Sequence, residues 1–336
     1  MSKFAAKSSG IPAADQQKAK TIIEKIARSY SAKVVGQESL RTSMLVAVIA
    51  NGHIMLESVP GLAKTLAAKT LAESVQAVFH RIQCTPDLLP SDIVGTQIYD
   101  ASTGSFSTQL GPVHANFVLL DEINRSSAKT QSAMLEAMQE RQTTIGGVEY
   151  KLPKPFLVMA TQNPIEQEGT YELPEAQLDR FLIKEIVDYP TPADELEVLA
   201  RLDSGVFDQE GSEGTLASLE DLLFLQQTAK KVYIDQTIRN YIVSLIYVTR
   251  NPKEYLGEKM ASYIEYGASP RGTIAFVQAS RALALLNGRD YVIPEDIKQL
   301  RHQILRHRVI LNYEADADNV RNDEVVDAIV NSIPSP

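Results

Sequence analysis

The chain alternates short, uniformly apolar segments with longer stretches of helical periodicity, and this alternation restricts the folds it can adopt. Residues 54–56, 117–120 and 156–160 are apolar runs of strand length, and residues 79–82 form a fourth strand-like run. Continuous apolar runs are typical of strands that are buried on both faces, as in parallel sheets. We therefore expect an α/β fold in which a mostly parallel sheet is flanked by helices.

Two further segments have the pattern of β-hairpins rather than of core strands. Residues 97–108 contain two short strand-like stretches around a turn at Gly104, and residues 143–150 contain two more around Gly146 and Gly147. A two-residue glycine turn tolerates the positive φ angles that tight hairpins require. Each hairpin is polar on one side, so we expect both to project from the core. They could contact a partner or be purely structural.

The sequence also indicates where the domains begin and end. We expect a flexible tail over residues 1–13, an α/β domain with hairpin inserts over residues 14–189, and a smaller all-helical domain over residues 190–336. The proline-containing segment 189–192 is extended by its own geometry and marks the junction. An acidic stretch, residues 203–218, is expected to form a loop within the second domain.

One helix of the second domain has clear start and stop signals. Ser269 is a predicted N-cap, Pro270 suits the first helical position, and apolar residues continue to Leu286 before Gly288.

Composition excludes several classes of protein. The 336 residues include 33 Lys+Arg and 42 Asp+Glu, a net charge of −9, which argues against coating nucleic acid or anionic membranes. A single cysteine, Cys84, excludes an internal disulfide framework and a cysteine-rich metal site, and favours a reducing compartment. The early apolar run at residues 44–50 is far too short to cross a membrane. We expect a soluble, cytoplasmic protein.

The segment between the first strand and its helix has the features of a phosphate-binding loop. It follows residues 54–56 and opens a helix expected over residues 65–78, so that unpaired N–H groups and the positive end of the helix dipole point to one place. Lys64 would reach the β- and γ-phosphates, and the Thr65 hydroxyl would bind Mg²⁺. Ser58 and Ala63 replace both glycines of the strict motif, so an ordinary strand–turn–helix with a chance Lys-Thr pair is the alternative.

Polar residues at the ends of two other strands favour the phosphate site. Asp121 and Glu122 directly follow the apolar run 117–120, and Asn163 follows the run 156–160. Open α/β sheets bind ligands at the carboxyl ends of their strands. Asp121 could hold Mg²⁺ through water, and Glu122 could orient and polarise the attacking water.

Taken together, these residues resemble the AAA+ ATPases, and specifically the MoxR family. The resemblance covers nearly the whole chain after the tail, and its most specific parts are residues 83–92 and 168–181. Residues 120–125 are similar to the Walker B motif and residues 160–164 to sensor 1. The resemblance implies binding of ATP with Mg²⁺ by residues of the adenine-side motif, the Walker A loop and the Walker B strand: Gly36, Gln37, Val59, Pro60, Gly61, Leu62, Ala63, Lys64, Thr65 and Asp121.

The resemblance also implies an AAA+ P-loop core followed by a helical lid, assembled into a ring that is expected to be a hexamer. Glu122 and Asn163 would be catalytic, together with Arg180, an arginine finger that contacts ATP in a neighbouring subunit. Arg271 resembles sensor 2 and could serve its own subunit or the next, and Arg125 could line the subunit interface. The plainer alternative for both Arg180 and Arg271 is a surface arginine on a helix.

One departure concerns Ser58, because the family usually has glycine there. If the position needs a positive φ, serine would strain the loop by roughly 1 kcal/mol or more and weaken ATP binding. We expect Cys84 to be a buried structural residue, and the spacing of His302 and His307 argues against a metal pair.

The leading function is an ATP-hydrolysing ring that remodels, matures or activates partner complexes. The resemblance implies a von Willebrand factor A-domain protein as partner, a client complex, and metal-cofactor insertion as one role. A DNA-directed AAA+ motor is an alternative, but residues 143–150 contain one acidic and no basic side chain, so nucleic acid is an unexpected partner. A nucleotide-gated scaffold with little hydrolysis is the other alternative.

Overall fold

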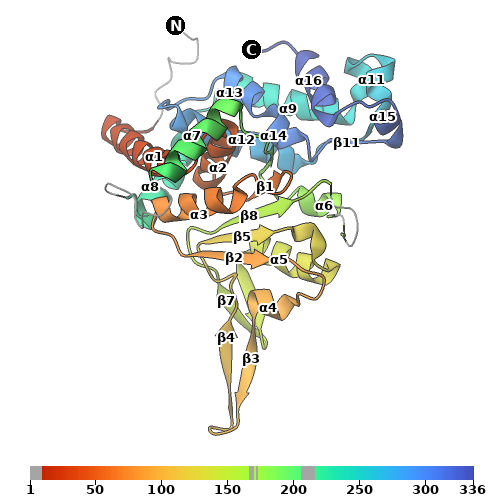
Figure 1. The fold of residues 1–336 in the computed structure, drawn as a ribbon. Coiled ribbons are helices and arrows are strands. Elements are labelled where there is room, and N and C mark those ends of the chain that lie inside the picture. The colour runs from red at the N-terminus through yellow and green to blue at the C-terminus, as the bar shows by residue number, and fades with distance from the viewer. Residues whose placement is uncertain (1–9, 166–169, 172, 206–215) are drawn as a thin grey trace.

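The computed structural model describes residues 10–165, 170–171, 173–205 and 216–336. The first part of the chain contains a central sheet with helices on both faces, and the second part is mainly helical (Figure 1). The expected tail (residues 1–13), the acidic loop (203–218) and the motif at 168–181 fall partly outside the described residues.

Five parallel strands form the central sheet in the order β2-β5-β8-β1-β9. Their bounds are β1 Ile54–Glu57, β2 Phe79–Gln83, β5 Phe117–Asp121, β8 Leu157–Gln162 and β9 Ile183–Ile186. The first four confirm the strands expected from the apolar runs. Alternate residues of the strands pack into two hydrophobic clusters on opposite faces of the sheet. Leu119 and Met159 belong to the cluster that includes the first helices and the lid, whereas Val118 and Val158 belong to the cluster that includes α5.

The fifth strand, β9, is absent from the expectations. Its inward-facing position is occupied by Glu185, which is buried and accepts hydrogen bonds from the hydroxyls of Ser39 (2.6 Å) and Ser43 (2.7 Å). A buried carboxylate that is satisfied by two hydroxyls interrupts the apolar pattern that marks the other strands.

Helices cover the two faces of the sheet. Those of the first part are α1 Ala13–Lys33, α2 Glu38–Ile49, α3 Lys64–Ser74, α4 Pro90–Val94, η1 Ile123–Arg125, α5 Ala128–Glu140 and α6 Glu175–Leu178. In Figure 1, α2 and α3 lie on one side of the sheet and α5 on the other. Helix α1 packs on α3 and also on the second part of the chain, so the lid rests on the N-terminal helix.

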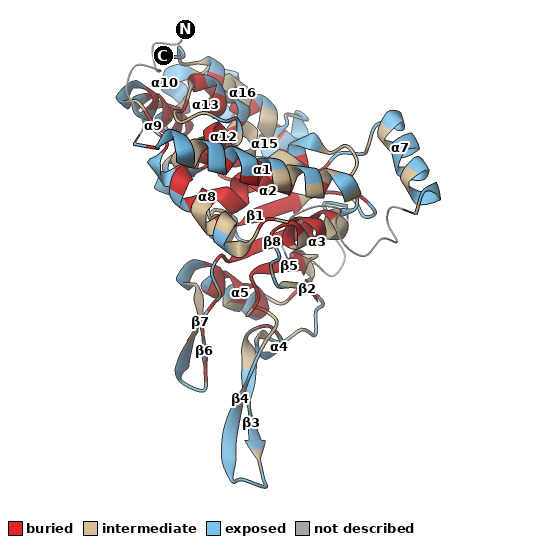
Figure 2. Cartoon of the chain, turned by 90° about the vertical axis from the view of Figure 1, so that its left-hand side faces the viewer, coloured by how far each residue is buried: buried red, intermediate tan, exposed pale blue. Residues whose placement is uncertain are grey.

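Both expected hairpins are confirmed. One is formed by β3 Gly95–Asp100 and β4 Ser105–Leu110, and the other by β6 Gln142–Ile145 and β7 Val148–Lys151. They extend in the same direction away from the body of the molecule, and their outer parts are exposed (Figure 2). The rings of Tyr99 and Phe106 contact each other across the longer hairpin, tilted by 55° with centroids 5.1 Å apart, although both side chains are exposed.

In residues 192–205 and 216–336, the regular structure is helical apart from one small two-stranded sheet. Its helices are α7 Pro192–Asp203, α8 Leu219–Lys231, α9 Gln236–Arg250, α10 Pro252–Tyr255, α11 Glu258–Ser262, α12 Pro270–Leu286, α13 Pro294–Gln299, α14 Arg301–Leu305, α15 Tyr313–Ala317 and α16 Asn322–Asn331. The expectation of an all-helical domain missed β10 Ile264–Tyr266 and β11 Ile310–Leu311, which pair antiparallel. Two and three residues are too few to show a strand pattern in sequence.

Helix α12 forms as expected. The Ser269 hydroxyl accepts a hydrogen bond from the Arg271 N–H, Pro270 is the first residue, and Gly288 has φ 70° beyond the end. Among the described residues, no helix is both long and apolar enough to cross a membrane.

Candidate active site

The loop between β1 and α3 wraps around the side chain of Lys64. The Lys64 Nζ donates hydrogen bonds to the carbonyls of Ser58 (3.1 Å) and Val59 (3.4 Å). Burial lowers the pKa of this ammonium, while the carboxylates of Asp121 and Glu122 act to raise it. The lysine therefore lies within the electrostatic reach of both acidic residues, as the sequence predicted.

Thr161 holds the two acidic residues in place. Its hydroxyl donates to the Asp121 Oδ1 (2.7 Å) and accepts from the Glu122 backbone N–H (2.8 Å). Glu122 has the left-handed backbone conformation, with φ 57°, so its side chain departs from the line of the strand. A non-glycine residue in this conformation costs free energy, and such residues are common at functional sites. Neither role of Thr161 was expected from sequence, although it stands in the sensor 1 segment.

Asn163 lies at the same edge, directly after β8. Its side chain is buried and its Oδ1 accepts a hydrogen bond from the Ile165 N–H (3.1 Å). The Ser58 N–H donates to the Gln162 carbonyl, which joins the loop after β1 to the end of β8. The ends of β1, β5 and β8 therefore meet, as expected for parallel neighbours.

The condition for strain at Ser58, a positive φ, is not met. Ser58 is buried, its backbone is not left-handed, and its hydroxyl donates to the Val59 carbonyl (3.0 Å). Ala63 has the left-handed conformation instead, with φ 53°, at the N-cap of α3. The strain of this loop lies at the second glycine position of the motif and not at the first.

A mostly apolar cavity of about 390 Å³ opens beside this loop. Val35, Gly61, Leu62 and Ala63 line one side, and Pro190, Val198 and Leu199 line the other. Gln37 spans the cavity wall by donating from Nε2 to the Leu62 carbonyl (3.2 Å). Apolar walls with few polar groups suit a flat heterocyclic base. The sequence did not predict that residues of α7 line this cavity. The helix lies about 130 residues after the loop, and nothing in its own sequence indicates the contact.

Gly36 permits the approach of α7 to this cavity. It has φ 62°, and a Cβ there would lie 2.6 Å from the Asp194 side chain on α7. Asp194 belongs to the capping box of that helix, because its carboxylate accepts from the Thr191 N–H and hydroxyl. A side chain at Gly36 would therefore strain the backbone and push against the start of α7.

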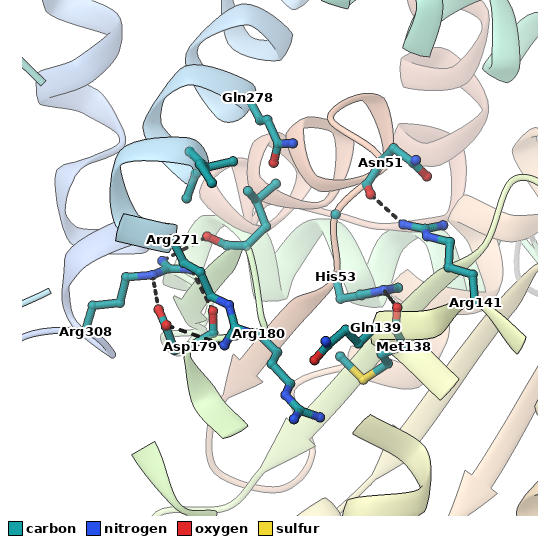
Figure 3. A pocket seen from close by; sticks show the side chains of 14 residues that line it. Asn51, His53, Met138, Gln139, Arg141, Asp179, Arg180, Arg271, Gln278 and Arg308 are labelled. Carbon is teal, nitrogen blue, oxygen red and sulfur yellow. Dashed lines mark hydrogen bonds and ion pairs between the residues drawn. The ribbon is translucent and has the colours of Figure 1, made fainter. Parts of the chain in front are cut away.

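Arg180 and Arg271 lie in a separate cavity of about 240 Å³ (Figure 3). Its lining shares no residue with the cavity beside Ala63. Four arginines line it, Arg141, Arg180, Arg271 and Arg308, with Asp179 as the one carboxylate. The Arg180 Nε is buried and has no hydrogen-bond partner within the described part of the chain. The pocket is thus rich in cationic donors.

Asp179 fixes this pocket to the lid. Its Oδ1 accepts from the Arg308 Nε (2.8 Å), and its Oδ2 accepts from the Ser269 hydroxyl (2.7 Å). The Arg271 Nη1 lies 3.7 Å from the same carboxylate, which compensates a cation at the start of α12. Burial lowers the pKa of Arg308 to about 10, although Asp179 opposes this shift. The sequence offered no signal for Arg308.

Cys84 is buried, as expected. Burial raises the pKa of the Cys84 thiol to about 12, so it carries no reactive thiolate. Among the described residues, no group of three or more His, Cys, Asp or Glu side chains could hold a metal ion. Arg125 donates to the Glu122 carboxylate (3.3 Å), which places it beside the acidic pair.

Comparisons with known proteins agree with this geometry. Residues 53–183 match the ATPase family associated with various cellular activities (AAA), and residues 258–329 match the AAA lid domain. The chain is 47% identical to Chaperone MoxR1 of Mycobacterium tuberculosis, over 90% of this chain and 79% of that protein. The chain belongs to the MoxR family of AAA ATPases. Two other relatives extend the likeness across nearly the whole chain.

The MoxR protein of Methylorubrum extorquens is 29% identical over 92% of this chain and 94% of its own length. A crystal structure from Cytophaga hutchinsonii, described as a candidate ATPase, is 45% identical with a TM-score of 0.89 and covers 96% of this chain and 97% of that one. A MoxR-family core followed by a helical lid is therefore the architecture of this protein.

Proposed function

We propose that this MoxR-family protein binds ATP with Mg²⁺ and hydrolyses it in a ring, expected to be a hexamer, to remodel, mature or activate partner complexes. The observation that carries the proposal is the convergence of Lys64, Asp121 and Glu122 at the carboxyl ends of neighbouring strands. A lysine beside two carboxylates after a strand–loop–helix unit is what phosphoryl transfer to water requires.

The residues present fit a Mg²⁺–nucleotide complex. The Thr65 hydroxyl and the Asp121 carboxylate are hard oxygen donors of the kind Mg²⁺ prefers. When bound, the metal would neutralise charge on the phosphates. Lys64 would exchange the carbonyls of Ser58 and Val59 for phosphate oxygens, while residues 59–63 would offer backbone N–H groups. The cavity lined by Val35, Gln37 and Leu199 suits the adenine.

Glu122 is proposed to orient and polarise the attacking water. Its backbone is anchored to Thr161 and its carboxylate is held by Gln83 (2.9 Å) and Arg125 (3.3 Å). Asn163, at the same edge, would position the water or the γ-phosphate from the other side. The positions of Glu122 and Asn163 directly after the neighbouring strands β5 and β8 support both roles.

We propose that Arg180 and Arg271 both act on nucleotide bound by the neighbouring subunit. They share one cavity that has no lining residue in common with the cavity beside the phosphate loop. The Arg180 Nε is buried and has no hydrogen-bond partner among the described residues, so it could donate to an acceptor from another molecule. A phosphate group is a suitable acceptor. Because Arg271 lines the same cavity as Arg180, we propose that Arg271 also contacts the nucleotide of the neighbouring subunit. The sequence left open whether Arg271 acts on its own subunit or on the next.

The exposed apolar face of α7 supports assembly. Leu196 is 69% exposed and Leu202 is 60% exposed, and no residue of α7 is buried within the chain. Large apolar side chains gathered on one helix face are typical of interaction sites. In a ring, this face would pack against a second copy next to the nucleotide.

The partners remain proposals drawn from the family. A chaperone role is supported by the name of the Mycobacterium tuberculosis relative. A von Willebrand factor A-domain partner, a client complex and metal-cofactor insertion come from the family resemblance alone. A cytoplasmic location agrees with the single, buried cysteine. A DNA-directed motor is disfavoured, since the described hairpins have Lys151, at the end of β7, as their one basic side chain.

ATP binding and turnover of the wild type, Lys64→Ala and Glu122→Gln test the proposal. We expect Lys64→Ala to lose nucleotide affinity, because it removes the cation that meets the phosphates. Glu122→Gln should bind ATP normally and lose most turnover. Equal, near-zero rates for wild type and Glu122→Gln would favour the scaffold, and turnover stimulated by DNA in a salt-sensitive way would favour the motor.

A further inference from the structure

A polar chain of side chains runs along the outer strand of the sheet to the two acidic residues. Arg81 and Gln83 lie two residues apart on β2, and therefore face the same side. Arg81 donates to the Asp121 Oδ2 from Nε (3.0 Å) and Nη2 (2.6 Å), and to the Gln83 Oε1 from Nη2 (2.6 Å). Gln83 in turn donates from Nε2 to the Glu122 Oε2 (2.9 Å).

One end of this hydrogen-bonded series of side chains engages the carboxylate of Asp121, which is proposed to bind the metal. The buried hydroxyl of Thr161 donates to the Asp121 Oδ1, which leaves the Oδ2 for other partners. That oxygen carries both hydrogen bonds from Arg81. A divalent cation near Asp121 would meet a guanidinium already seated on its ligand, and the two positive charges would repel each other.

The pair is also free to separate. The Arg81 side chain is 48% exposed and lies on an edge strand, whereas Asp121 is 13% exposed. Arg81 can therefore swing into solvent without burying its own charge, and a metal ion bound at Asp121 would then compensate the carboxylate that Arg81 leaves. An ion pair with one well-exposed partner is weak, which makes it reversible at low cost.

We propose that Arg81 is a positioning residue that competes with Mg²⁺ for Asp121 and must release this carboxylate when the metal and nucleotide bind. The inference rests on the proposed function, in which Asp121 serves the metal. Because Arg81 also contacts Gln83, its release would loosen the Gln83 contact to Glu122. Metal binding would thus free Asp121 and weaken one of the two contacts that hold the Glu122 carboxylate, the other being Arg125 (3.3 Å).

The test measures metal binding rather than turnover. Mn²⁺ binding in the presence of ADP is followed by electron paramagnetic resonance for wild type, Arg81→Gln and Arg81→Lys. Arg81→Gln should lower the Mn²⁺ concentration at half-saturation about two- to fivefold, the range that exposed ion pairs contribute. Arg81→Lys keeps the charge and should stay closer to wild type. The shift should shrink in high salt, because exposed charges are screened.

Arg321→Gln is the matched control. Arg321 is an exposed arginine paired with Glu324 (3.0 Å), so this variant also removes one charge and one ion pair, but away from Asp121. It should leave the Mn²⁺ midpoint unchanged. An unchanged or raised midpoint in Arg81→Gln, or equal shifts in all three variants, would overturn the inference. Failure of the wild type to bind Mn²⁺ with ADP would overturn the proposed function as well.

Discussion

Replacing Asp179 by alanine is expected to destabilise the contact between core and lid. The Arg308 side chain is 2% exposed, and its guanidinium is held by the Asp179 carboxylate and by the carbonyls of Phe181, Leu182 and Ile304. Asp179→Ala leaves this charge buried with no carboxylate. Removing one partner of a buried ion pair costs about 3–5 kcal/mol, because the other charge stays uncompensated.

The magnitude can be checked against an exposed pair in the same protein. The free energy of unfolding would be measured by equilibrium urea unfolding, followed by far-UV circular dichroism, for Asp179→Ala and for Glu324→Ala. Glu324 pairs with Arg321, whose side chain is 81% exposed, so its loss should cost about 1 kcal/mol or less. The double variant Asp179→Leu/Arg308→Met, which removes both charges, should be more stable than Asp179→Ala.

A loss in Asp179→Ala no larger than that in Glu324→Ala would refute the reasoning. It would mean that Arg308 finds water or another acceptor once Asp179 is gone.

Three other predictions follow from particular side chains. Ser58→Gly should change nucleotide affinity less than about twofold in a direct binding titration, because the Ser58 backbone is not left-handed. Ala63→Gly should raise the free energy of unfolding by about 0.5–1 kcal/mol, because the Ala63 backbone is left-handed. Burial lowers the pKa of His53 to about 3, so the folded protein loses stability as the pH falls below about 6.5, by about 2 kcal/mol at pH 5. The free energy of unfolding would be measured in urea at several pH values for wild type and His53→Gln. Its slope against pH should correspond to one fewer proton taken up on unfolding in His53→Gln, and an unchanged slope would contradict the assignment. Leu202→Glu should weaken self-association roughly tenfold or more by light scattering with ATP present. Val243→Glu, a change of an exposed side chain on α9, should not.

Much of the fold follows from local patterns in the sequence. Residues 54–56, 117–120 and 156–160 become strands because each run is buried on both faces, whereas β2 is an edge strand that is largely exposed. The glycine turns become hairpin tips because they permit positive φ. The polar residues after β5 and β8 meet beside Lys64 because parallel neighbours end at one edge of a sheet. Such features depend on short segments and on one topological rule, so sequence suffices to predict them.

Other parts of the site depend on contacts between distant segments. The buried Glu185 is acceptable only because two serines of α2 reach it, and Arg308 becomes important only because the lid brings it to Asp179. Val198 and Leu199 line a cavity that faces the phosphate loop across a sequence gap of more than 130 residues. The position of strain at Ala63 rather than Ser58 depends on the path of the loop, which residue types alone do not reveal.

The central claim is that nucleotide held by Lys64 of one subunit meets Arg180 of the next. The most direct measurement mixes Lys64→Ala, which keeps Arg180, with Arg180→Ala, which keeps the phosphate loop. Each variant alone should hydrolyse almost no ATP. An equal mixture should recover about a quarter of wild-type turnover, because a quarter of random interfaces pair an intact loop with an intact arginine finger. A mixture that remains as inactive as its components would contradict the account.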